Sequence, residues 1–193
     1  MKRIFDIVVS SVGLLFLLPF FLVVAVIIKL DSGGPVFFRQ ERIGRNFTPF
    51  RIFKFRTMTV DAPGLGPQIT VGGDRRVTLI GKLLRKTKID ELPQLINVLK
   101  GEMSFVGPRP EVRRYVELFR SDYERLLRVR PGITDPASIK YSDEEGTLSS
   151  SADWEKEYIG RILPEKIQLA SKYVDDHNML LDLKLIVNTI LRR

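Results

Sequence analysis

The stretch IVVSSVGLLFLLPFFLVVAVII, residues 7–28, is 22 residues long and carries no charged side chain. A helix of this length reaches about 33 Å, which is enough to cross the hydrocarbon core of a bilayer. It is apolar on every face, unlike a helix of a water-soluble domain, and no small-x-small cleavage site follows it as in a signal peptide. We therefore predict a membrane anchor over residues 1–31 and a membrane-associated domain over residues 32–193.

Pro19 lies near the middle of this stretch. Its ring removes a backbone donor and clashes with the carbonyl of Leu15, so the sequence predicts a kink. Lys and Arg flank the segment on both sides, and such flanks favour the cytoplasm. A helix that enters the bilayer, breaks at Pro19 and returns keeps both flanks there, so we favour this re-entrant form, whereas length alone favours a kinked single span. The flanking cations are Lys2, Arg3, Lys29, Arg39, Arg42 and Arg45.

The composition of the chain narrows the chemistry that it can perform. Its formal net charge of +8 predicts an anionic partner, such as nucleic acid, anionic lipid or a phosphorylated small molecule. The chain has no cysteine, which excludes disulfides, thiolate catalysis and thiolate zinc sites. Because His177 is the only histidine, a histidine triad is excluded within one chain. Acid–base or nucleophilic work is left to Asp, Glu, Lys, Ser, Thr or Tyr side chains.

Two segments after the apolar stretch predict a hairpin and a basic helix. Residues 35–58 are rich in Phe, Ile and Arg around the turn signal GRN at 44–46, which is typical of a β-hairpin. Residues 75–88 carry six basic residues and no acidic one, with apolar residues at helical spacing between positions 79 and 84. This helix either lies on an anionic membrane surface or packs on a core with a solvated basic face.

The remaining chain predicts further helices and no second globular domain. We predict an α+β fold that is mostly helical, with a re-entrant membrane helix, a small β-hairpin and several amphipathic helices on the membrane surface. The further helices are expected over residues 91–100, 112–130, 152–176 with an interruption at Pro164, and 180–193.

The segment KIDELPQLINVLKGEMSFVGPRP, residues 88–110, sets two carboxylates side by side, Asp90 and Glu91. Asp is a preferred helix N-cap and Glu suits the positive end of a helix, so the pair has an ordinary structural interpretation. Cations also surround the pair in the sequence, and they are expected to hold both carboxylates ionised near neutral pH. These cations are Arg85, Lys86, Lys88 and Arg109.

Arg109 stands between Pro108 and Pro110, and the two prolines restrict the loop. A pre-set arginine can grip a phosphate with two donors at little entropic cost. An ionised carboxylate that attacks phosphorus needs a metal or cations to offset the charge on both reactants, whereas a helix cap needs neither. We therefore favour a catalytic role for Asp90 and Glu91, with which capping by Asp90 is compatible.

These residues, together with IFKFRTM at 52–58, RPGIT at 130–134 and the apolar N-terminus, resemble the bacterial sugar transferase family. The similar members are small monotopic phosphoglycosyl transferases that start glycan assembly on a polyprenyl phosphate. The resemblance runs from about residue 2 to about residue 191. The DELPQ and GPRP blocks at this spacing are specific to the family, whereas the apolar segment is not.

The resemblance implies a reaction and a role for each site residue. A UDP-sugar gives its phosphosugar to the enzyme and UMP leaves, and polyprenyl (undecaprenyl) phosphate then takes the phosphosugar. Asp90 would be the nucleophile that forms an acyl-phosphate intermediate with Mg²⁺ bound beside it. Glu91 would be its partner in metal binding or in proton removal from the acceptor. The residues implied in phosphate and nucleotide binding are Lys54, Arg85, Arg109, Pro108 and Pro110.

The resemblance also implies a location and partners. The enzyme would sit in the bacterial inner (cytoplasmic) membrane, with its catalytic domain on the cytoplasmic face. Expected partners are the UDP-sugar, polyprenyl phosphate and membrane lipids, with no nucleic acid, and a homodimer is compatible with the sequence. The alternative is a non-enzymatic basic membrane adaptor that binds anionic lipid or nucleic acid. A polytopic transferase is disfavoured, because it would need several spans.

The chain departs from the family pattern at two places. Many relatives have Ser-Pro at the membrane break, whereas this chain has Leu18-Pro19. Many relatives continue RPGITG into a Gln-x-Asn-Gly-Arg segment, whereas this chain reads RPGITDPASIKYS over residues 130–142. The arginine that the family places there is missing, and Lys140 is a candidate substitute nearby.

Overall fold

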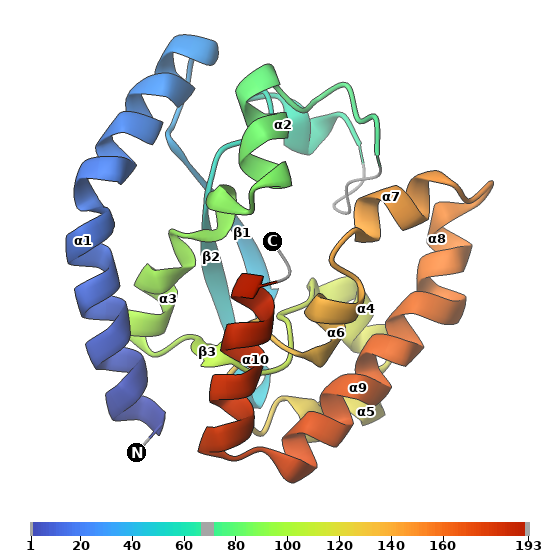
Figure 1. The fold of residues 1–193 in the computed structure, drawn as a ribbon. Coiled ribbons are helices and arrows are strands. Elements are labelled where there is room, and N and C mark those ends of the chain that lie inside the picture. The colour runs from blue at the N-terminus through green and yellow to red at the C-terminus, as the bar shows by residue number, and fades with distance from the viewer. Residues whose placement is uncertain (1, 67–71, 192–193) are drawn as a thin grey trace.

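A computed structural model describes residues 2–66 and 72–191. Figure 1 shows a long N-terminal helix along one side, a hairpin in the middle and shorter helices on the other side. The predicted α+β, mostly helical fold is confirmed. The helices are α1 (Lys2–Asp31), α2 (Leu79–Lys86), α3 (Gln94–Lys100), α4 (Arg113–Leu118), α5 (Arg120–Leu126), α6 (Pro136–Lys140), α7 (Glu144–Ser149), α8 (Trp154–Glu157), α9 (Leu163–Asp176) and α10 (Met179–Leu191). The strands are β1 (Phe37–Ile43), β2 (Pro49–Phe55), β3 (Ser104–Val106) and β4 (Gly132–Thr134).

Helix α1 runs without interruption through Pro19, and Figure 1 shows its axis bending along its length. Within residues 2–66 and 72–191, it is the one helix long and apolar enough to cross a membrane. A narrow stripe of α1 is buried against the rest of the chain, and most of its other apolar side chains are exposed. The helix is therefore not interrupted at Pro19, and its re-entrant path through a bilayer stays a prediction. The buried stripe consists of Asp6, Ser10, Phe21, Val24 and Ile28.

Both ends of α1 are fastened to the rest of the chain. At the N-terminal end, the Lys2 ammonium donates a hydrogen bond of 2.8 Å to the carbonyl of Val106. Just beyond the C-terminal end, Arg56 donates a hydrogen bond of 2.6 Å to the carbonyl of Ser32. The helix therefore lies along the other elements and does not project away from them, as Figure 1 shows.

The predicted hairpin is confirmed as β1 paired antiparallel with β2, in a register from Phe37–Phe55 to Ile43–Pro49. In its turn, Asn46 has a φ of 53°, a left-handed conformation that asparagine tolerates better than most residues. The hairpin places the predicted Lys54 near the end of β2, beside the segment that carries the carboxylate pair.

Helix α3 covers the free edge of β2. The side-chain amide of Asn97 donates to the carbonyl of Arg51 and accepts from the N–H of Phe53, both at 2.9 Å. These bonds satisfy backbone groups that an uncovered edge strand would expose. The helix predicted over residues 91–100 ends as expected before Gly101, whose φ is 86°. Because α3 is held against β2, the turn that precedes it is held there too.

The sequence does not predict the second pair of strands. Strand β3 pairs in parallel with β4, with Ser104 opposite Gly132 and Val106 opposite Thr134. Each strand has only three residues, too few for an alternating pattern to be recognised. A β-carbon on Gly132 would lie 2.1 Å from the backbone nitrogen of Gly107, so the two segments approach too closely for any side chain there.

Two of the predicted helices are built differently. The helix expected over residues 112–130 is broken at Phe119, whose φ of −117° and ψ of 38° are not helical. In the helix expected over residues 152–176, a π-helical turn precedes α9, and Pro164 lies in the first turn of α9. A proline cannot donate to the preceding turn, and the wider π-helical turn accommodates this. The last predicted helix forms as α10, but residues 192–193 lie outside the described residues.

Among the described residues, four apolar clusters hold these elements together, and two of them join the N-terminal elements to the rest of the chain. Leu84 of α2 is buried in a cluster with Phe21 and Phe55 that joins α1 to β2, whereas Leu79 and Leu83 are exposed. Core packing is therefore confirmed for one face of α2, and membrane contact stays a prediction for the other. A larger cluster joins the end of β1 to the helices of the C-terminal half, through residues that include Tyr115, Val116, Leu126, Ile162 and Leu163.

Candidate active site at the carboxylate pair

Asp90 lies in a 3₁₀ turn, Ile89–Glu91, between α2 and α3. The turn follows Lys88, whose φ is 56°, and the N-cap position of α3 is Pro93. Asp90 makes no capping hydrogen bond, and its buried Oδ1 has no hydrogen-bond partner although the residue is only 7% exposed. The interpretation of Asp90 as a helix cap is therefore wrong, and its burial needs another explanation.

Glu91 is the carboxylate on which the predicted cations meet. Lys54, from β2, pairs with Oε1 of Glu91 at 2.7 Å. Arg109, from the loop after β3, pairs with the same oxygen and also donates a hydrogen bond of 3.3 Å to Oε2. Three of the predicted site residues are thus in direct contact, although they come from three separate parts of the chain.

The pKa values of the two adjacent carboxylates are shifted in opposite directions. Burial alone would raise the pKa of Glu91, but Arg109 and Lys54 together hold that pKa well below its usual range. For Asp90, burial raises the pKa, and Lys54 opposes this effect without cancelling it. The expectation that cations stabilise both ionised carboxylates is confirmed for Glu91. At Asp90 desolvation raises the pKa more than the surrounding cations lower it, and its ionisation near neutral pH stays a prediction.

Arg85 reaches the site from α2 but does not pair with either carboxylate of the turn. Its Nε donates to the Thr57 hydroxyl at 2.9 Å, and its Nη1 pairs with Glu145 of α7 at 2.7 Å. Its charge still lowers the pKa of Asp90, so it lies within electrostatic range of that carboxylate. A phosphate that binds Arg85 would therefore compete with Glu145 for it.

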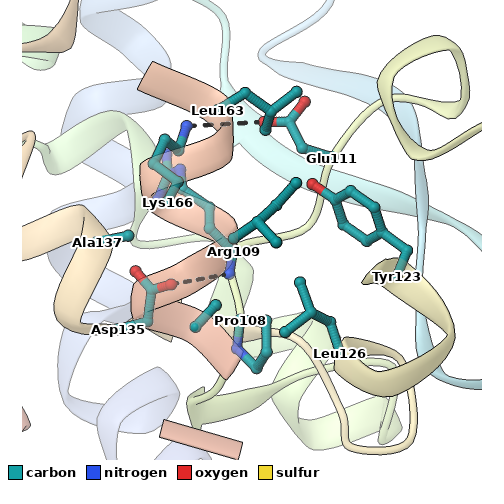
Figure 2. A pocket seen from close by; sticks show the side chains of 11 residues that line it. Pro108, Arg109, Glu111, Tyr123, Leu126, Asp135, Ala137, Leu163 and Lys166 are labelled. Atoms are coloured by element: carbon teal, nitrogen blue, oxygen red, sulfur yellow. Dashed lines mark hydrogen bonds and ion pairs between the residues drawn. The ribbon is translucent and has the colours of Figure 1, made fainter. Parts of the chain in front are cut away.

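The loop with Pro108, Arg109 and Pro110 leaves β3 along a fixed path. The carbonyl of Pro108 accepts a hydrogen bond of 3.1 Å from the N–H of Gly132. The N–H of Arg109 donates to Oδ2 of Asp135 at 3.3 Å. Figure 2 shows Pro108, Arg109 and Asp135 lining one side of a pocket behind this loop. The predicted loop residues therefore lie at the site, with Arg109 held at both its backbone and its side chain.

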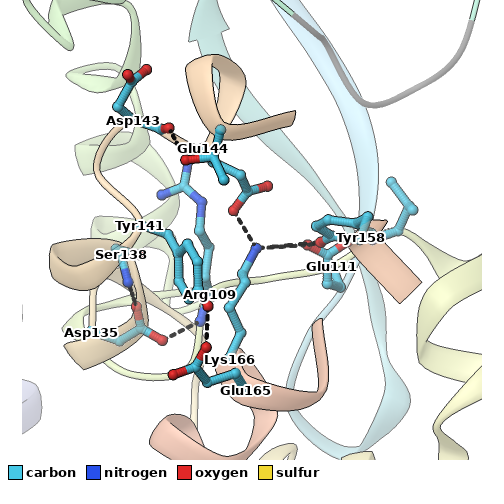
Figure 3. A network of polar contacts seen from close by, with 12 residues as sticks. Arg109, Glu111, Asp135, Ser138, Tyr141, Asp143, Glu144, Tyr158, Glu165 and Lys166 are labelled. Atoms are coloured by element: carbon cyan, nitrogen blue, oxygen red, sulfur yellow. Dashed lines mark hydrogen bonds and ion pairs between the residues drawn. The ribbon is translucent and has the colours of Figure 1, made fainter. Parts of the chain in front are cut away.

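A network of buried polar groups lies behind the loop and was not predicted (Figure 3). Glu111 accepts a hydrogen bond of 2.9 Å from the Tyr158 hydroxyl, and Lys166 lies 3.8 Å from the same carboxylate. Lys166 also pairs with Glu144 of α7 at 2.8 Å. Burial alone would raise the pKa of Glu111, but Lys166 and Arg42 lower it below its ordinary value. No local signal marks these residues, because their partners come from distant segments.

Asp90 and Gln94 are the candidate residues for holding a magnesium ion. Both polar atoms of the Gln94 side chain are buried without a partner, and Gln94 lies one helical turn after Asp90 and is 1% exposed. Within residues 2–66 and 72–191, no group of three His, Cys, Asp or Glu side chains is placed to hold a metal. Magnesium is usually held by one or two carboxylates together with substrate phosphates, so the Asp90 carboxylate is compatible with such a site, and binding of the ion stays a prediction.

Lys140, the candidate substitute for the missing arginine, points its ammonium at another carboxylate. It lies at the end of α6 and pairs with Glu165 of α9, and the Tyr141 hydroxyl donates to the same carboxylate. Among the contacts of the described residues, none joins Lys140 to Asp90 or Glu91. The carboxylate pair therefore relies on Lys54 and Arg109 and not on Lys140.

Known proteins match the chain along its whole length. A family model described as bacterial sugar transferase matches residues 1–193. The chain is 40% identical over 192 residues to the UDP-N-acetylgalactosamine-undecaprenyl-phosphate N-acetylgalactosaminephosphotransferase of Aeromonas hydrophila, which covers 98% of this chain and 42% of that protein. It is 39% identical over 195 residues to the UDP-glucose:undecaprenyl-phosphate glucose-1-phosphate transferase of Klebsiella pneumoniae, which covers 99% of this chain and 39% of that protein.

A third relative is closer to this chain in length. The exopolysaccharide production protein PSS of Rhizobium leguminosarum bv. phaseoli is 39% identical over 198 residues, which cover 98% of this chain and 93% of that protein. The chain thus spans 42% and 39% of the first two relatives and nearly all of the third.

Proposed function

Because the chain belongs to the bacterial sugar transferase family, we propose that it transfers a phosphosugar from a UDP-sugar to undecaprenyl phosphate and releases UMP. Two relatives named for a UDP-sugar and undecaprenyl phosphate are 40% and 39% identical to it, which supports this reaction class. One observation supports the proposed residues. Asp90 keeps a buried oxygen without a partner directly beside Glu91, which two cations hold.

In the first half of the proposed reaction, a carboxylate oxygen of Asp90 attacks the phosphorus that carries the sugar. A bond forms between this oxygen and phosphorus, the bond from phosphorus to the oxygen bridging the two phosphates breaks, and UMP leaves with that oxygen. The free Oδ1 of Asp90 suits this role, because no hydrogen bond has to be broken before the attack. Burial raises the pKa of Asp90, which indicates a poorly stabilised anion and hence a better nucleophile.

In the second half, an oxygen of undecaprenyl phosphate attacks the same phosphorus. The bond to Asp90 breaks, the carboxylate is restored, and the product is a sugar linked to the lipid by a diphosphate. One diphosphate bond is exchanged for another, so no external energy source is needed. A covalent step also lets a soluble donor and a lipid acceptor use one site in turn.

Glu91 has a different role from Asp90 in this proposal. Arg109 and Lys54 hold its pKa well below the usual range despite its burial, so Glu91 stays ionised and is a weak proton acceptor. We assign it to orienting Lys54 and Arg109, whose other donors would bind the phosphates of the donor substrate. Mg²⁺, when bound, would neutralise phosphate charge, and Asp90 and Gln94 are the residues that would hold it.

We also propose that the site faces the cytoplasmic surface of the bacterial inner membrane, with α1 as a re-entrant anchor. A polyprenyl phosphate keeps its head group at the bilayer surface, so its enzyme must work at that depth. The contacts of Lys2 with Val106 and of Arg56 with Ser32 support an anchor whose two ends stay with one body. An upright span would carry one of these ends across the bilayer.

Release of UMP is the test of the overall reaction. Full-length protein in lipid nanodiscs is incubated with UDP-sugars, Mg²⁺ and undecaprenyl phosphate, and we expect UMP to appear with one of the donors. Asp90→Asn should release none. If the wild-type protein releases no UMP but still binds anionic vesicles, and Asp90→Asn binds them equally well, the protein is an adaptor and the proposal is wrong.

The covalent step has a separate test. Incubation with the donor alone should increase the mass of the peptide that contains Asp90 by one phosphosugar, and later addition of undecaprenyl phosphate should remove it. UMP that appears only when the acceptor is present would contradict the intermediate while leaving the overall transfer intact.

A further inference from the structure

Asp135 is the most completely buried carboxylate near the proposed site, at 1% exposed. It lies between the end of β4 and the start of α6. Its Oδ1 accepts a hydrogen bond of 2.7 Å from the N–H of Ser138, which caps α6. Its Oδ2 accepts a hydrogen bond of 3.3 Å from the N–H of Arg109. One carboxylate therefore connects the start of a helix with the loop that carries Arg109, as Figure 2 shows for the second contact.

The bond from Arg109 to Asp135 adds a side-chain contact directly after the backbone bonds that join β3 and its loop to β4. The N–H of Gly107 donates to the carbonyl of Thr134, and the carbonyl of Pro108 accepts from the N–H of Gly132, both at 3.1 Å. Within residues 108–110, Pro108 and Pro110 have no N–H, so Arg109 carries the only backbone donor of these three residues. A buried N–H without an acceptor is unfavourable, and the carboxylate of Asp135 meets this need.

The direction of the Arg109 side chain depends on this anchorage. Its guanidinium spans from the loop to Glu91, where it meets both carboxylate oxygens. When the backbone is fixed, the end group of a long side chain has fewer positions to choose from. Less conformational entropy is then lost when that group binds a substrate. If the N–H of Arg109 lost its acceptor, the loop could rotate between the two prolines and shift the guanidinium.

We propose that Asp135 is a positioning residue for the proposed transfer, which holds the backbone of Arg109 so that its guanidinium meets Glu91 and the diphosphate of the donor. The expected change in kinetics rests on the proposed function. The hydrogen bond between Arg109 and Asp135 is independent of that function. Asp135 touches neither substrate nor Asp90 in this role, and it acts through Arg109 alone.

Asp135→Asn is the informative variant, because it separates the two contacts. Asparagine can still cap Ser138 with its carbonyl oxygen, but it then presents an NH₂ donor to the N–H of Arg109. We expect the donor KM to rise about tenfold with a smaller fall in kcat, since a displaced binding group can lower rate and affinity by up to about a hundredfold. Asp153→Asn is the matched control, because Asp153 also caps a helix, through Lys156 at 3.1 Å, and should change neither constant.

A double-mutant cycle shows whether Asp135 acts through Arg109. In an Arg109→Ala background, Asp135→Asn should have no further effect on the donor KM. An equal tenfold rise in both backgrounds would overturn the inference and make Asp135 a structural residue. An Asp135→Asn enzyme with the wild-type KM would overturn it as well.

Hydrogen exchange tests the contact without any assay of activity. Mass spectrometry of the peptide that contains Arg109 should show faster amide exchange in Asp135→Asn than in wild-type protein, and no change in Asp153→Asn. Unchanged exchange would overturn the inference even in an active enzyme. If the wild-type protein releases no UMP but exchange responds as expected, the proposed function fails and the anchorage of Arg109 stands.

Discussion

Asp90 and Glu111 are buried to the same extent, each 7% exposed, but they differ in their partners. Glu111 accepts hydrogen bonds from the Tyr158 hydroxyl and the Val112 N–H, and Lys166 lies within 3.8 Å. Asp90 has one oxygen without a partner. Burial by itself therefore does not tell whether a carboxylate has its hydrogen-bond partners within the fold.

The difference between the two carboxylates lies in what their surroundings do to the charge. Lysine and arginine overcome the effect of burial at Glu111 and lower its pKa, whereas burial prevails at Asp90 and raises its pKa. A satisfied buried carboxylate stabilises the fold, and one with an unpaired oxygen destabilises it until a ligand supplies the partner. The comparison predicts that the two sites respond in opposite ways to loss of charge.

The largest expected effect is that of Asp90→Asn on activity. Loss of the proposed nucleophile should lower UMP release by about 10⁴-fold or more, in the range known for removal of an enzyme nucleophile. The same change should leave the free energy of unfolding unchanged or raise it by about 1 kcal/mol, because it removes a poorly stabilised buried charge. Urea unfolding in detergent, alongside UMP release, measures both.

If Asp90→Asn were inactive because it is unfolded, its loss of activity would say nothing about the role of Asp90 as a nucleophile. Asp90→Asn should therefore show the same far-ultraviolet circular dichroism as wild-type protein. Strong destabilisation by Asp90→Asn would mean that both oxygens of Asp90 have partners in the fold, and the contrast with Glu111 would then be wrong.

Glu111→Gln should show the reverse pattern. Its removal leaves the charge of Lys166 buried with only Glu144 beside it, so we expect a loss of about 3 kcal/mol in the free energy of unfolding. Activity per folded molecule should fall less than tenfold, because Glu111 does not contact the carboxylate pair. Glu117→Gln, at an exposed pair with Arg120, is the control and should change stability by less than about 0.5 kcal/mol.

The pH dependence of stability should separate the two sites further. The lowered pKa of Glu111 contributes stability that is present above about pH 4.3 and is lost as pH falls through the folded pKa, so the loss caused by Glu111→Gln should shrink only in that acidic range. The raised pKa of Asp90 reduces stability at neutral pH and ceases to do so below about pH 3.9. Any gain from Asp90→Asn should therefore shrink as pH falls through the folded pKa of Asp90 toward about 3.9, whereas the loss from Glu111→Gln should shrink as pH falls below about 4.3.

Urea titrations at half-unit steps from pH 7 to pH 3 measure this for wild-type protein and both variants. The comparison would be refuted by a gain from Asp90→Asn that stays constant over the whole range, because the carboxylate would then have the same pKa in the folded and unfolded chains.

Local patterns in the sequence predict the elements that depend on local physics. The apolar helix around Pro19 and the hairpin around the turn at 44–46 are both present, because periodicity and turn residues determine them. The structure brings Glu91 of the DELPQ block into contact with Arg109 of the GPRP block and with Lys54, and the roles of these residues stay proposals.

What the sequence does not predict depends on contacts between distant segments. Strands β3 and β4 have three residues each, and only their mutual approach at Gly107 and Gly132 makes them strands. The partners of Glu111 come from α9 and the π-helical turn, which no spacing rule connects to it. Helix-capping propensity also misjudges Asp90, because it describes what aspartate does on average and not whether its oxygen is free.

The smallest expected effect concerns the ion pair of Arg85 with Glu145. In the proposed reaction, Arg85 binds a phosphate of the donor, and Glu145 competes for it. Their pair is 2.7 Å long and partly exposed, so it contributes at most about 1 kcal/mol. Glu145→Gln should free Arg85 for the donor and lower the donor KM by about two- to fivefold, with kcat nearly unchanged. Glu155→Gln, which releases Arg114 from a similar surface pair at 2.7 Å, is the matched control and should leave KM as it is. Arg85 forms no ion pair with Asp90 or Glu91, so freeing it should change the binding of the donor and not the rate of the bound complex. A fall in kcat with unchanged KM would contradict this. It would show that Glu145 itself takes part in the reaction.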